Sequence, residues 1–333
     1  MKITKIIFES RSSSFEMTQK ILKQFAHLPQ LEVENIRDHW GRTKKPYLEK
    51  RDNLHLYLGI RPEPHIKPAP DAYGISKQGE PHFYFIHAYN CIYECEYCYL
   101  QGHFQTPDLV LFVNHEDITH SIQKQIEMTP SAWFHAGEFS DSLALSHLTD
   151  EWKSYFDLFK KYPTAQLELR TKSTNIQSIL KLDPSPNIHI TFSLSPSEVA
   201  KRYDRQTPAI ANRLRAIQSL VHHSFKIGIH LDPIILESNT QEKYQELIAQ
   251  LTLVLPNTQL SYLSLGVVRF TDNVWHQVKK NYPDTALNQQ TLIESFDNKW
   301  RAPRPIRQWQ MGKIKEELIK SGYDESKIYY CME

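Results

Sequence analysis

The feature that most limits how this chain can fold is a short loop that carries three of its four cysteines. Cys91, Cys95 and Cys98 lie within eight residues, and Cys331 stands far away near the other end of the chain. Thiolates at this spacing allow one loop to wrap a single inorganic centre. An apolar run at 82–86 predicts a strand directly before the loop. We therefore expect a fold that builds its site in loops after parallel strands.

The number of thiolates separates the possible centres. A closed structural zinc site takes four ligands, so zinc would need a histidine such as His87 or His103 beside the three cysteines. An electron-carrying iron–sulfur cluster usually has four thiolates. A [4Fe-4S] cubane held by three leaves one iron free for a small molecule, and the spacing here resembles the signature of the radical S-adenosyl-L-methionine (SAM) enzymes. A non-catalytic zinc or iron–sulfur module is the alternative.

Composition narrows the class of protein. The 333 residues are 40% hydrophobic and 23% charged, which is ordinary for a soluble protein, and no apolar run is long enough to span a membrane. The first eight residues indicate a strand and not a signal peptide. Neighbouring free thiols need a reducing compartment, so we expect a cytoplasmic protein. The net charge of +1 means that any contact with nucleic acid must use a local patch.

Predicted strands and helices alternate along most of the chain. We expect strands at 3–8, 31–36, 54–60, 82–86, 109–113, 132–135, 167–170, 188–193, 226–231 and 260–268. We expect helices at 15–26, 117–126, 150–161, 174–182, 209–222, 240–254 and 309–320. This alternation predicts a parallel sheet, and about six units between 82 and 270 are too few for a closed eight-stranded barrel. Periodicity alone does not separate an open barrel from a doubly wound sheet.

The run Cys95-Glu96-Tyr97-Cys98-Tyr99-Leu100-Gln101 closely resembles the spore photoproduct lyase family, which are radical SAM enzymes that reverse a thymine–thymine photolesion in DNA. Shorter similarities occur at 137–142, 170–172, 192–193, 269–271 and 328–333. The resemblance favours an α/β fold with an open partial (β/α)6 barrel of the radical SAM type. We divide the chain into an N-terminal β-α-β unit with a covering segment (1–80), the barrel (81–272) and a C-terminal extension (273–333).

The resemblance also implies the cofactors and the residues that bind them. In this family a [4Fe-4S] cluster, here on Cys91, Cys95 and Cys98, reduces SAM to methionine and a 5′-deoxyadenosyl radical. The family pattern places Ser140 and Asp141 near the SAM amino group, and Lys172 and Ser193 near its carboxylate and ribose. Each of these four could instead be an ordinary polar loop residue.

Two tyrosines beside the last cysteine carry a further expectation. In the family, the residues that match Tyr97 and Tyr99 are thought to relay a hydrogen atom between the product radical and the cofactor. A phenolic O–H bond is weak enough to break reversibly. The alternative is simple packing of the two rings against the cysteine loop.

The chain departs from the family at the residue that completes repair. Family members carry there a cysteine that gives a hydrogen atom to the thymine radical, and this chain has Glu138. A carboxylic O–H is a far poorer hydrogen-atom donor than a thiol, and Glu138 instead resembles the glutamate by which other radical SAM enzymes accept the SAM ammonium. Either another group donates, with Cys331 as the remaining thiol, or the substrate differs. Cys331 could also be a buried small hydrophobe.

Basic residues near the C-terminus suggest contacts with a substrate. Arg301 and Arg304 lie in a basic stretch around Trp300, and Arg269 follows the last predicted strand. Such residues can contact phosphates, or they can belong to a solvated loop. We expect damaged DNA as substrate and a reductant such as flavodoxin or ferredoxin. The alternative is a radical SAM enzyme of the same fold that acts on a modified nucleotide, RNA or another substrate, and the oligomeric state is left open.

Overall fold

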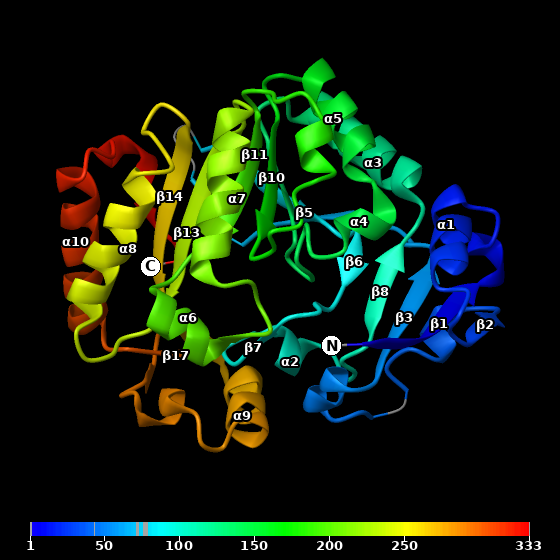
Figure 1. Cartoon of the computed structure of the whole chain (residues 1–333), viewed down its shortest axis with the longest axis horizontal. Coiled ribbons are helices and arrows are strands. Elements are labelled where there is room, and N and C mark those ends of the chain that lie inside the picture. Colours follow the sequence, from blue (N-terminus) through cyan, green and yellow to red (C-terminus); the bar gives the residue numbers. More distant parts are fainter. Residues whose placement is uncertain (1, 43, 71–72, 76–78, 333) are drawn as a thin grey trace.

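The computed structural model describes residues 2–42, 44–70, 73–75 and 79–332. Its largest sheet has eight strands in the order β18-β14-β13-β11-β10-β9-β5-β4. Seven of them run parallel, and the six from β5 to β14 form the predicted open partial barrel (Figure 1). These six are β5 (His82–Phe85), β9 (Trp133–Ala136), β10 (Gln166–Thr171), β11 (Ile188–Ser193), β13 (Lys226–Ile234) and β14 (Leu260–Val267).

The two edges of this sheet are closed by short strands. β18 (Ile328–Tyr330) pairs parallel to β14, and β4 (Ile66–Pro68) pairs antiparallel to β5. β18 brings the C-terminal residues back to the barrel, because it lies beside a strand that ends more than 60 residues earlier in the sequence. Met332 therefore lies beside the loops that follow the barrel strands.

Helices cover the outer face of the barrel (Figure 1). Their apolar residues form one large buried cluster with the sheet, which includes Phe134, Trp152, Ile190 and Leu251. The covering helices are α3 (His115–Met128), α5 (Trp152–Lys161), α7 (Ile210–His222), α8 (Thr240–Thr252) and α10 (Arg304–Lys320), with the shorter α6 (Ser197–Tyr203). The short helix α4 (Ser146–Thr149) instead packs its Leu148 into the core of the N-terminal sheet.

The helix predicted at 174–182 is wrong, since the segment has only a short 3-10 turn at Ile179–Lys181. Side chains satisfy the backbone just before it. The hydroxyl of Thr171 accepts from the N–H of Ser173 at 2.8 Å, and the hydroxyl of Ser173 accepts from the N–H of Asn175 at 3.0 Å. Such local hydrogen bonds compete with the start of a helix.

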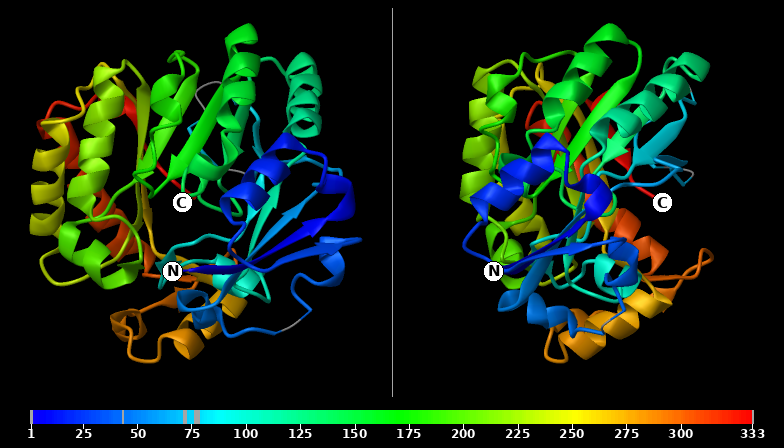
Figure 2. Two further views of the ribbon diagram at one scale, coloured as in Figure 1. Left: turned by 45° about the vertical axis from the view of Figure 1, so that its right-hand side comes forward. Right: turned by 90° about the vertical axis from the view of Figure 1, so that its right-hand side faces the viewer.

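A second, five-stranded sheet lies beside the barrel and has the order β2-β1-β3-β8-β6 (Figure 2). It contains the predicted β-α-β unit, and it also contains two strands from beyond residue 80. The strand expected at 109–113 therefore does not belong to the barrel, because β8 pairs parallel to β3. The elements are β1 (Ile3–Glu9), α1 (Glu16–Gln24), β2 (Gln30–Val33), β3 (Leu54–Gly59), β6 (Ala88–Tyr89) and β8 (Leu109–Phe112), with 3-10 turns at Ser10–Ser12, Ile36–Asp38 and Tyr47–Arg51.

The cysteine loop runs between these two sheets. Its strand β7 (Glu94–Cys95) pairs antiparallel with β12 (Asp204–Arg205), and α2 (Leu100–His103) follows the last cysteine. Among the described residues, no helix has the length and apolar character needed to cross a bilayer.

The C-terminal extension forms a small three-stranded sheet and two helices. The basic stretch around Trp300 lies on β17 and at the start of α10. The new elements are β15 (Arg269–Thr271), α9 (Asp272–Asn281), β16 (Ile293–Glu294) and β17 (Lys299–Arg301), with 3-10 turns at Ala286–Gln289 and Glu325–Lys327.

Candidate active site

A cavity of about 410 Å³ opens where the cysteine loop meets the loops after the barrel strands. This is the edge at which open α/β folds place their ligands. Most of the residues predicted from the sequence line it together. They are Cys91, Cys95, Tyr97, Cys98, Tyr99, Glu138, Ser140, Asp141, Lys172, Ser193 and Arg269.

The cysteine loop is fixed by the two glutamates on either side of Cys95. Glu94 and Glu96 are both buried, and each carboxylate binds an arginine outside the loop. Glu94 pairs with Arg51, and Glu96 pairs with Arg205. Because neighbouring side chains on an extended segment point to opposite sides, these two ion pairs leave Cys95 facing the cavity. The two ion pairs therefore hold the loop on the side that faces away from the cavity.

Lys50 is a buried cation beside the cysteines. Its ammonium donates to the carbonyl oxygen of Tyr93 at 2.5 Å and to the hydroxyl of Tyr47 at 2.7 Å. Burial lowers the pKa of Lys50, and nearby thiolates oppose this effect. In the absence of metal, burial raises the pKa of the Cys95 thiol to about 12. The thiolates that a cluster needs would therefore be stabilised by the cluster's own iron and by cations such as Lys50.

The donor set fits an iron–sulfur cluster. Three thiols face one cavity, and the N–H of Tyr93 donates to the sulfur of Cys91 at 3.4 Å, a contact typical of metal-bound thiolates. Within the described residues, no three side chains of His, Cys, Asp or Glu gather around a single metal position. Cys91, Cys95 and Cys98 are the residues that would hold the cluster.

The histidines of the zinc alternative already have other partners. The Nε2 atom of His87 lies 3.2 Å from the hydroxyl of Ser140, and burial lowers the pKa of His87 to about 3. The ring of His103 packs between Phe104 and Phe139, at 4.8 and 5.0 Å between centroids. The structure therefore offers no support for either histidine as a fourth ligand.

Tyr97 is hydrogen-bonded to the buried carboxylate of Asp204, which also acts electrostatically on Lys172. The hydroxyl of Tyr97 donates to Asp204, and Arg213 donates to the other oxygen of Asp204 at 3.0 Å. The ammonium of Lys172 lies 5.1 Å from the centroid of the Tyr97 ring. Burial alone would lower the pKa of Lys172, but the Cys95 thiolate and Asp204 outweigh it, so the pKa is raised. Lys172 is therefore a permanent cation in the wall of the cavity.

Asp141 organises the loop after β9. One of its oxygens accepts from the N–H groups of Leu143 and Ala144 and from the hydroxyl of Thr171, and the other accepts from the N–H of Lys172 at 2.7 Å. Both carboxylate oxygens are thus engaged in joining the loops after β9 and β10. This geometry favours a positioning role over direct contact with the SAM amino group.

Glu138 lines the same cavity as the cysteines and accepts a hydrogen bond from the hydroxyl of Tyr73 at 2.8 Å. The turn before it requires Gly137, whose φ is +90° and whose added Cβ would lie 2.6 Å from the hydroxyl of Ser142. Tyr73 also lines the cavity and was not anticipated from the sequence. Its position in a Pro-rich segment gave no periodic signal.

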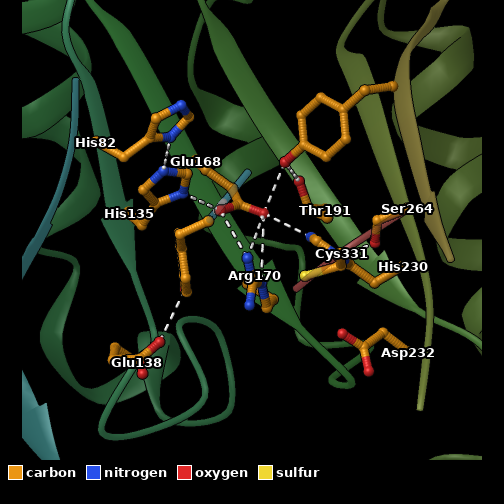
Figure 3. Close-up of polar contacts among 12 residues, drawn as sticks. His82, His135, Glu138, Glu168, Arg170, Thr191, His230, Asp232, Ser264 and Cys331 are labelled. Carbon is orange, nitrogen blue, oxygen red and sulfur yellow. Dashed lines mark hydrogen bonds and ion pairs between the residues drawn. The ribbon is translucent and has the colours of Figure 1, made fainter. Parts of the chain in front are cut away.

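A buried polar network fills the barrel beneath the cavity (Figure 3). At its centre, Glu168 accepts from Arg170 at 3.1 Å, from His230 at 2.8 Å and from Tyr262 at 2.6 Å. His135 also contacts Glu168. Arg170 reaches the cavity wall, so its cation is held there by a carboxylate below. The apolar strand pattern did not reveal this network.

Three of the other predicted residues, Cys331, Arg301 and Arg304, lie outside the cavity wall. The thiol of Cys331 is buried against Asp232 and Arg269, with 4.0 Å between its sulfur and the guanidinium, and burial raises its pKa to about 12. Its neighbour Met332 lines the cavity in its place. Arg301 is buried and bonds to Asp297 and to the carbonyl of Met332.

These contacts make Arg301 an anchor for the C-terminal residues. The expectation that Arg301 contacts substrate is therefore not supported. Arg304 is exposed at the start of α10, and Arg269 forms a two-point ion pair with Asp232, with both N–O distances at 3.0 Å.

Comparison with known proteins agrees with this geometry. A family model described as spore photoproduct lyase matches residues 76–328. The chain belongs to the spore photoproduct lyase family. It is therefore a radical SAM lyase with a [4Fe-4S] cluster and SAM as cofactors, as the sequence predicted.

Individual relatives have low sequence identity to this chain but align with it over much of its length. The chain is 23% identical to the spore photoproduct lyase of Clostridium acetobutylicum over 302 residues, which cover 88% of this chain and 86% of the relative. It is 26% identical to that of Bacillus subtilis over 205 residues, or 60% of each chain.

Solved structures share the fold. A spore photoproduct lyase double mutant with bound AdoMet and dinucleoside spore photoproduct superposes with a TM-score of 0.83 at 20% identity, covering 99% of this chain and 98% of the other. A spore photoproduct lyase complexed with the same dinucleoside gives 0.81 at 20% identity, covering 99% of both chains.

Proposed function

We propose that this protein repairs spore photoproduct, a thymine–thymine photolesion in DNA, in the 410 Å³ cavity. The observation that carries the proposal is that the three cysteines, both relay tyrosines and the predicted SAM contacts line one cavity at the strand ends. Family membership supports this reaction, and two related structures hold the dinucleoside lesion. Such a cavity falls within the usual size range for a ligand site of about 300 to 1,000 Å³.

The residues of the wall have distinct tasks toward SAM. When bound, the cluster would supply one electron that cleaves SAM to methionine and a 5′-deoxyadenosyl radical. Lys172 provides a fixed positive charge for the SAM carboxylate, and Ser193 a hydroxyl for its ribose. Ser140 and Glu138 offer oxygens to the ammonium, and Asp141 sets the loop that carries Ser140.

Tyr97 and Tyr99 differ in how freely they can exchange a hydrogen atom. The hydroxyl of Tyr97 is committed to Asp204, whereas the Tyr99 hydroxyl has no hydrogen-bond partner among the described residues and its side chain is 40% exposed. We infer that Tyr99 faces the substrate and that Tyr97 lies closer to the cofactor end of the relay, because Tyr97 contacts the lysine assigned to SAM.

The DNA is expected to approach over the C-terminal sheet. Lys299 of β17 and Thr271 of β15 line the cavity. Phe296, in the turn between β16 and β17, is 86% exposed. A basic residue at the mouth, an exposed aromatic ring for base stacking and the exposed Arg304 suit a nucleic acid from which one lesion must enter the cavity.

The remaining partners follow from the chemistry. The cluster needs a one-electron reductant such as flavodoxin or ferredoxin. All four cysteines are free thiols, which supports a reducing compartment such as the cytoplasm.

One experiment tests the proposed function. The cluster is reconstituted without oxygen, reduced, and incubated with SAM and dinucleoside spore photoproduct, and thymine monomers are measured with 5′-deoxyadenosine. Thymine release in the wild type, but not in Cys95→Ala, is expected. If 5′-deoxyadenosine forms while the lesion stays intact, the protein is a radical SAM enzyme for another substrate. That outcome would agree with the presence of Glu138 in place of the family's donor cysteine.

A further inference from the structure

Repair of the lesion ends with a carbon radical on thymine that must gain a hydrogen atom. The donor has to present a weak O–H or S–H bond in the cavity and be held in a fixed position. Besides the three cluster cysteines, the side chains of this kind in the described wall of the cavity are four tyrosines. They are Tyr73, Tyr93, Tyr97 and Tyr99.

Three of the four tyrosines are poorly suited to this step. Tyr97 directs its hydroxyl to Asp204. Tyr93 stands within the cysteine loop between two cluster ligands, where its backbone contacts Lys50. Tyr99 is 40% exposed and its hydroxyl has no partner among the described residues, so nothing fixes its direction. Cys331 lies behind Met332 and does not line the cavity.

Three contacts hold the side chain of Tyr73 in place. Its hydroxyl donates to Glu138 at 2.8 Å, and its ring meets His135 edge-on at 4.9 Å between centroids. The guanidinium of Arg170 lies 5.2 Å from the ring centroid. Only 8% of Tyr73 is exposed, yet it lines the cavity.

The backbone also favours this placement of Tyr73. Gly74 has a φ of +79°, and a Cβ at that position would lie 2.6 Å from the ring of His82. His82 is in turn hydrogen-bonded to His135 at 2.8 Å. His135 therefore contacts the ring of Tyr73, and His82 packs against the next residue, Gly74. The polar network of the barrel thus fixes both residues.

We propose that Tyr73 is the hydrogen-atom donor to the thymine radical and that Glu138 positions its hydroxyl. This inference rests on the proposed function. The O–H bond of Tyr73 breaks homolytically, a C–H bond forms on thymine, and the unpaired electron remains on the Tyr73 oxygen. One electron from the same flavodoxin- or ferredoxin-type reductant and one proton from water restore the phenol.

The protonation state of Tyr73 agrees with this role. Burial raises the pKa of Tyr73 well above its usual value, Arg170 opposes the rise, and Glu138 adds to it. Tyr73 therefore keeps its hydroxyl hydrogen at neutral pH. Glu138 thus occupies the position of the family's donor cysteine while holding a different donor in place.

The first test measures how the thymine radical is quenched. Reconstituted wild type, Tyr73→Phe and Cys331→Ala are given SAM, reductant and dinucleoside spore photoproduct in D₂O. We expect one deuterium in the thymine methyl group of the wild type, and a several-fold lower yield of thymine per lesion consumed in Tyr73→Phe but not in Cys331→Ala. A thymine methyl without deuterium, or the reverse order of the two variants, overturns the proposal.

A second measurement separates donation from binding and packing. Calorimetry of the cluster-free protein with the dinucleoside should give the same affinity for Tyr73→Phe and wild type, and a matching fall in affinity would make Tyr73 a binding residue instead. Glu138→Cys, introduced into Tyr73→Phe, should restore thymine yield by placing a thiol on the same wall. Failure to restore it would assign the defect to lost packing and overturn the proposal.

These outcomes are distinct from failure of the proposed function. If the wild type forms 5′-deoxyadenosine but never consumes the lesion, the substrate assignment fails. If the wild type releases thymine normally and Tyr73→Phe does too, only the donor assignment fails.

Discussion

Tyr97 of the cysteine loop donates its hydroxyl to Asp204, 107 residues later in the chain. The same contact joins the two halves of the site, because β7 of the cysteine loop and β12, which carries Asp204, are paired strands. Asp204 also binds Arg213, whose side chain is fully buried. One carboxylate therefore neutralises a buried arginine, accepts a hydrogen bond from Tyr97 and acts electrostatically on Lys172.

The first prediction concerns this carboxylate. Asp204→Asn keeps the shape of the side chain but leaves the buried Arg213 without its ion-pair partner. The free energy of unfolding should fall by about 3 to 5 kcal/mol, the usual cost of breaking a buried ion pair. Urea unfolding of the cluster-free protein measures it. Asp157→Asn, in an exposed pair with Lys153, is the control and should change the value by less than about 1 kcal/mol.

The second prediction concerns the cluster ligands. Alanine at Cys91, Cys95 or Cys98 should each abolish SAM cleavage, because the loss of one of three ligands exposes a second iron and the cluster degrades. Iron content per chain and formation of 5′-deoxyadenosine are the measurements. Cys331→Ala is the matched control, since its thiol is buried against Arg269 and should not affect iron content. Full activity in any of the three loop variants would contradict the assignment.

The third prediction concerns SAM binding. If Lys172 binds the SAM carboxylate as proposed, Lys172→Ala removes a charge-assisted hydrogen bond and should weaken SAM binding by about 1.5 to 3 kcal/mol. Calorimetry with the reconstituted protein measures the affinity. Lys160→Ala removes a lysine on the outer helix α5 that pairs with the exposed Asp183 and should leave affinity unchanged. Equal SAM affinities in the two variants would show that Lys172 does not bind SAM and has only a structural role.

The six barrel strands were predictable from the sequence because each carries buried apolar residues at the spacing of a strand, such as Leu167 and Leu169 of β10. The same property hid the partner of β8. Leu109 to Phe112 are all buried, and such a run suits the barrel and the N-terminal sheet equally well. The choice between the two sheets depends on pairing with β3, which is a long-range contact that local patterns do not encode.

The candidate site was predictable only where residues follow strands or flank the cysteines. Tyr73 and Lys50 come from the segment before the barrel, and their side chains reach the site through the fold alone. Asp204 lies between two helices in the sequence, α6 and α7, and gave no signal until its pairing with Tyr97 was known.

The fourth prediction is a pH dependence caused by Glu151. Its side chain is buried, its Oε2 atom has no hydrogen-bond partner among the described residues, and burial raises its pKa to about 8. The folded state therefore keeps a proton that the unfolded state loses above about pH 4.3. This contribution to stability is complete below that pH and is lost as the pH rises to 8.

Glu151→Gln removes that titration. The free energy of unfolding of the variant, minus that of the wild type, should rise by up to about 1.4 kcal/mol per pH unit between pH 5 and 8. Urea unfolding at several pH values measures this difference, and other titrating groups cancel because both proteins contain them. A difference that stays constant over this range would show that Glu151 is already ionised in the folded protein.

The fifth prediction separates the two arginines of the C-terminal stretch. If the exposed Arg304 contacts a DNA phosphate, Arg304→Ala should weaken binding to lesion-bearing duplex and lower the slope of log affinity against log salt by about 0.9. Fluorescence anisotropy over a range of salt concentrations measures this slope. Arg301→Lys should leave the slope unchanged and instead lower thermal stability, because Arg301 is buried against Asp297 and the Met332 carbonyl. An unchanged slope in Arg304→Ala would move the phosphate contact elsewhere, with Lys299 at the cavity mouth as the next residue to substitute.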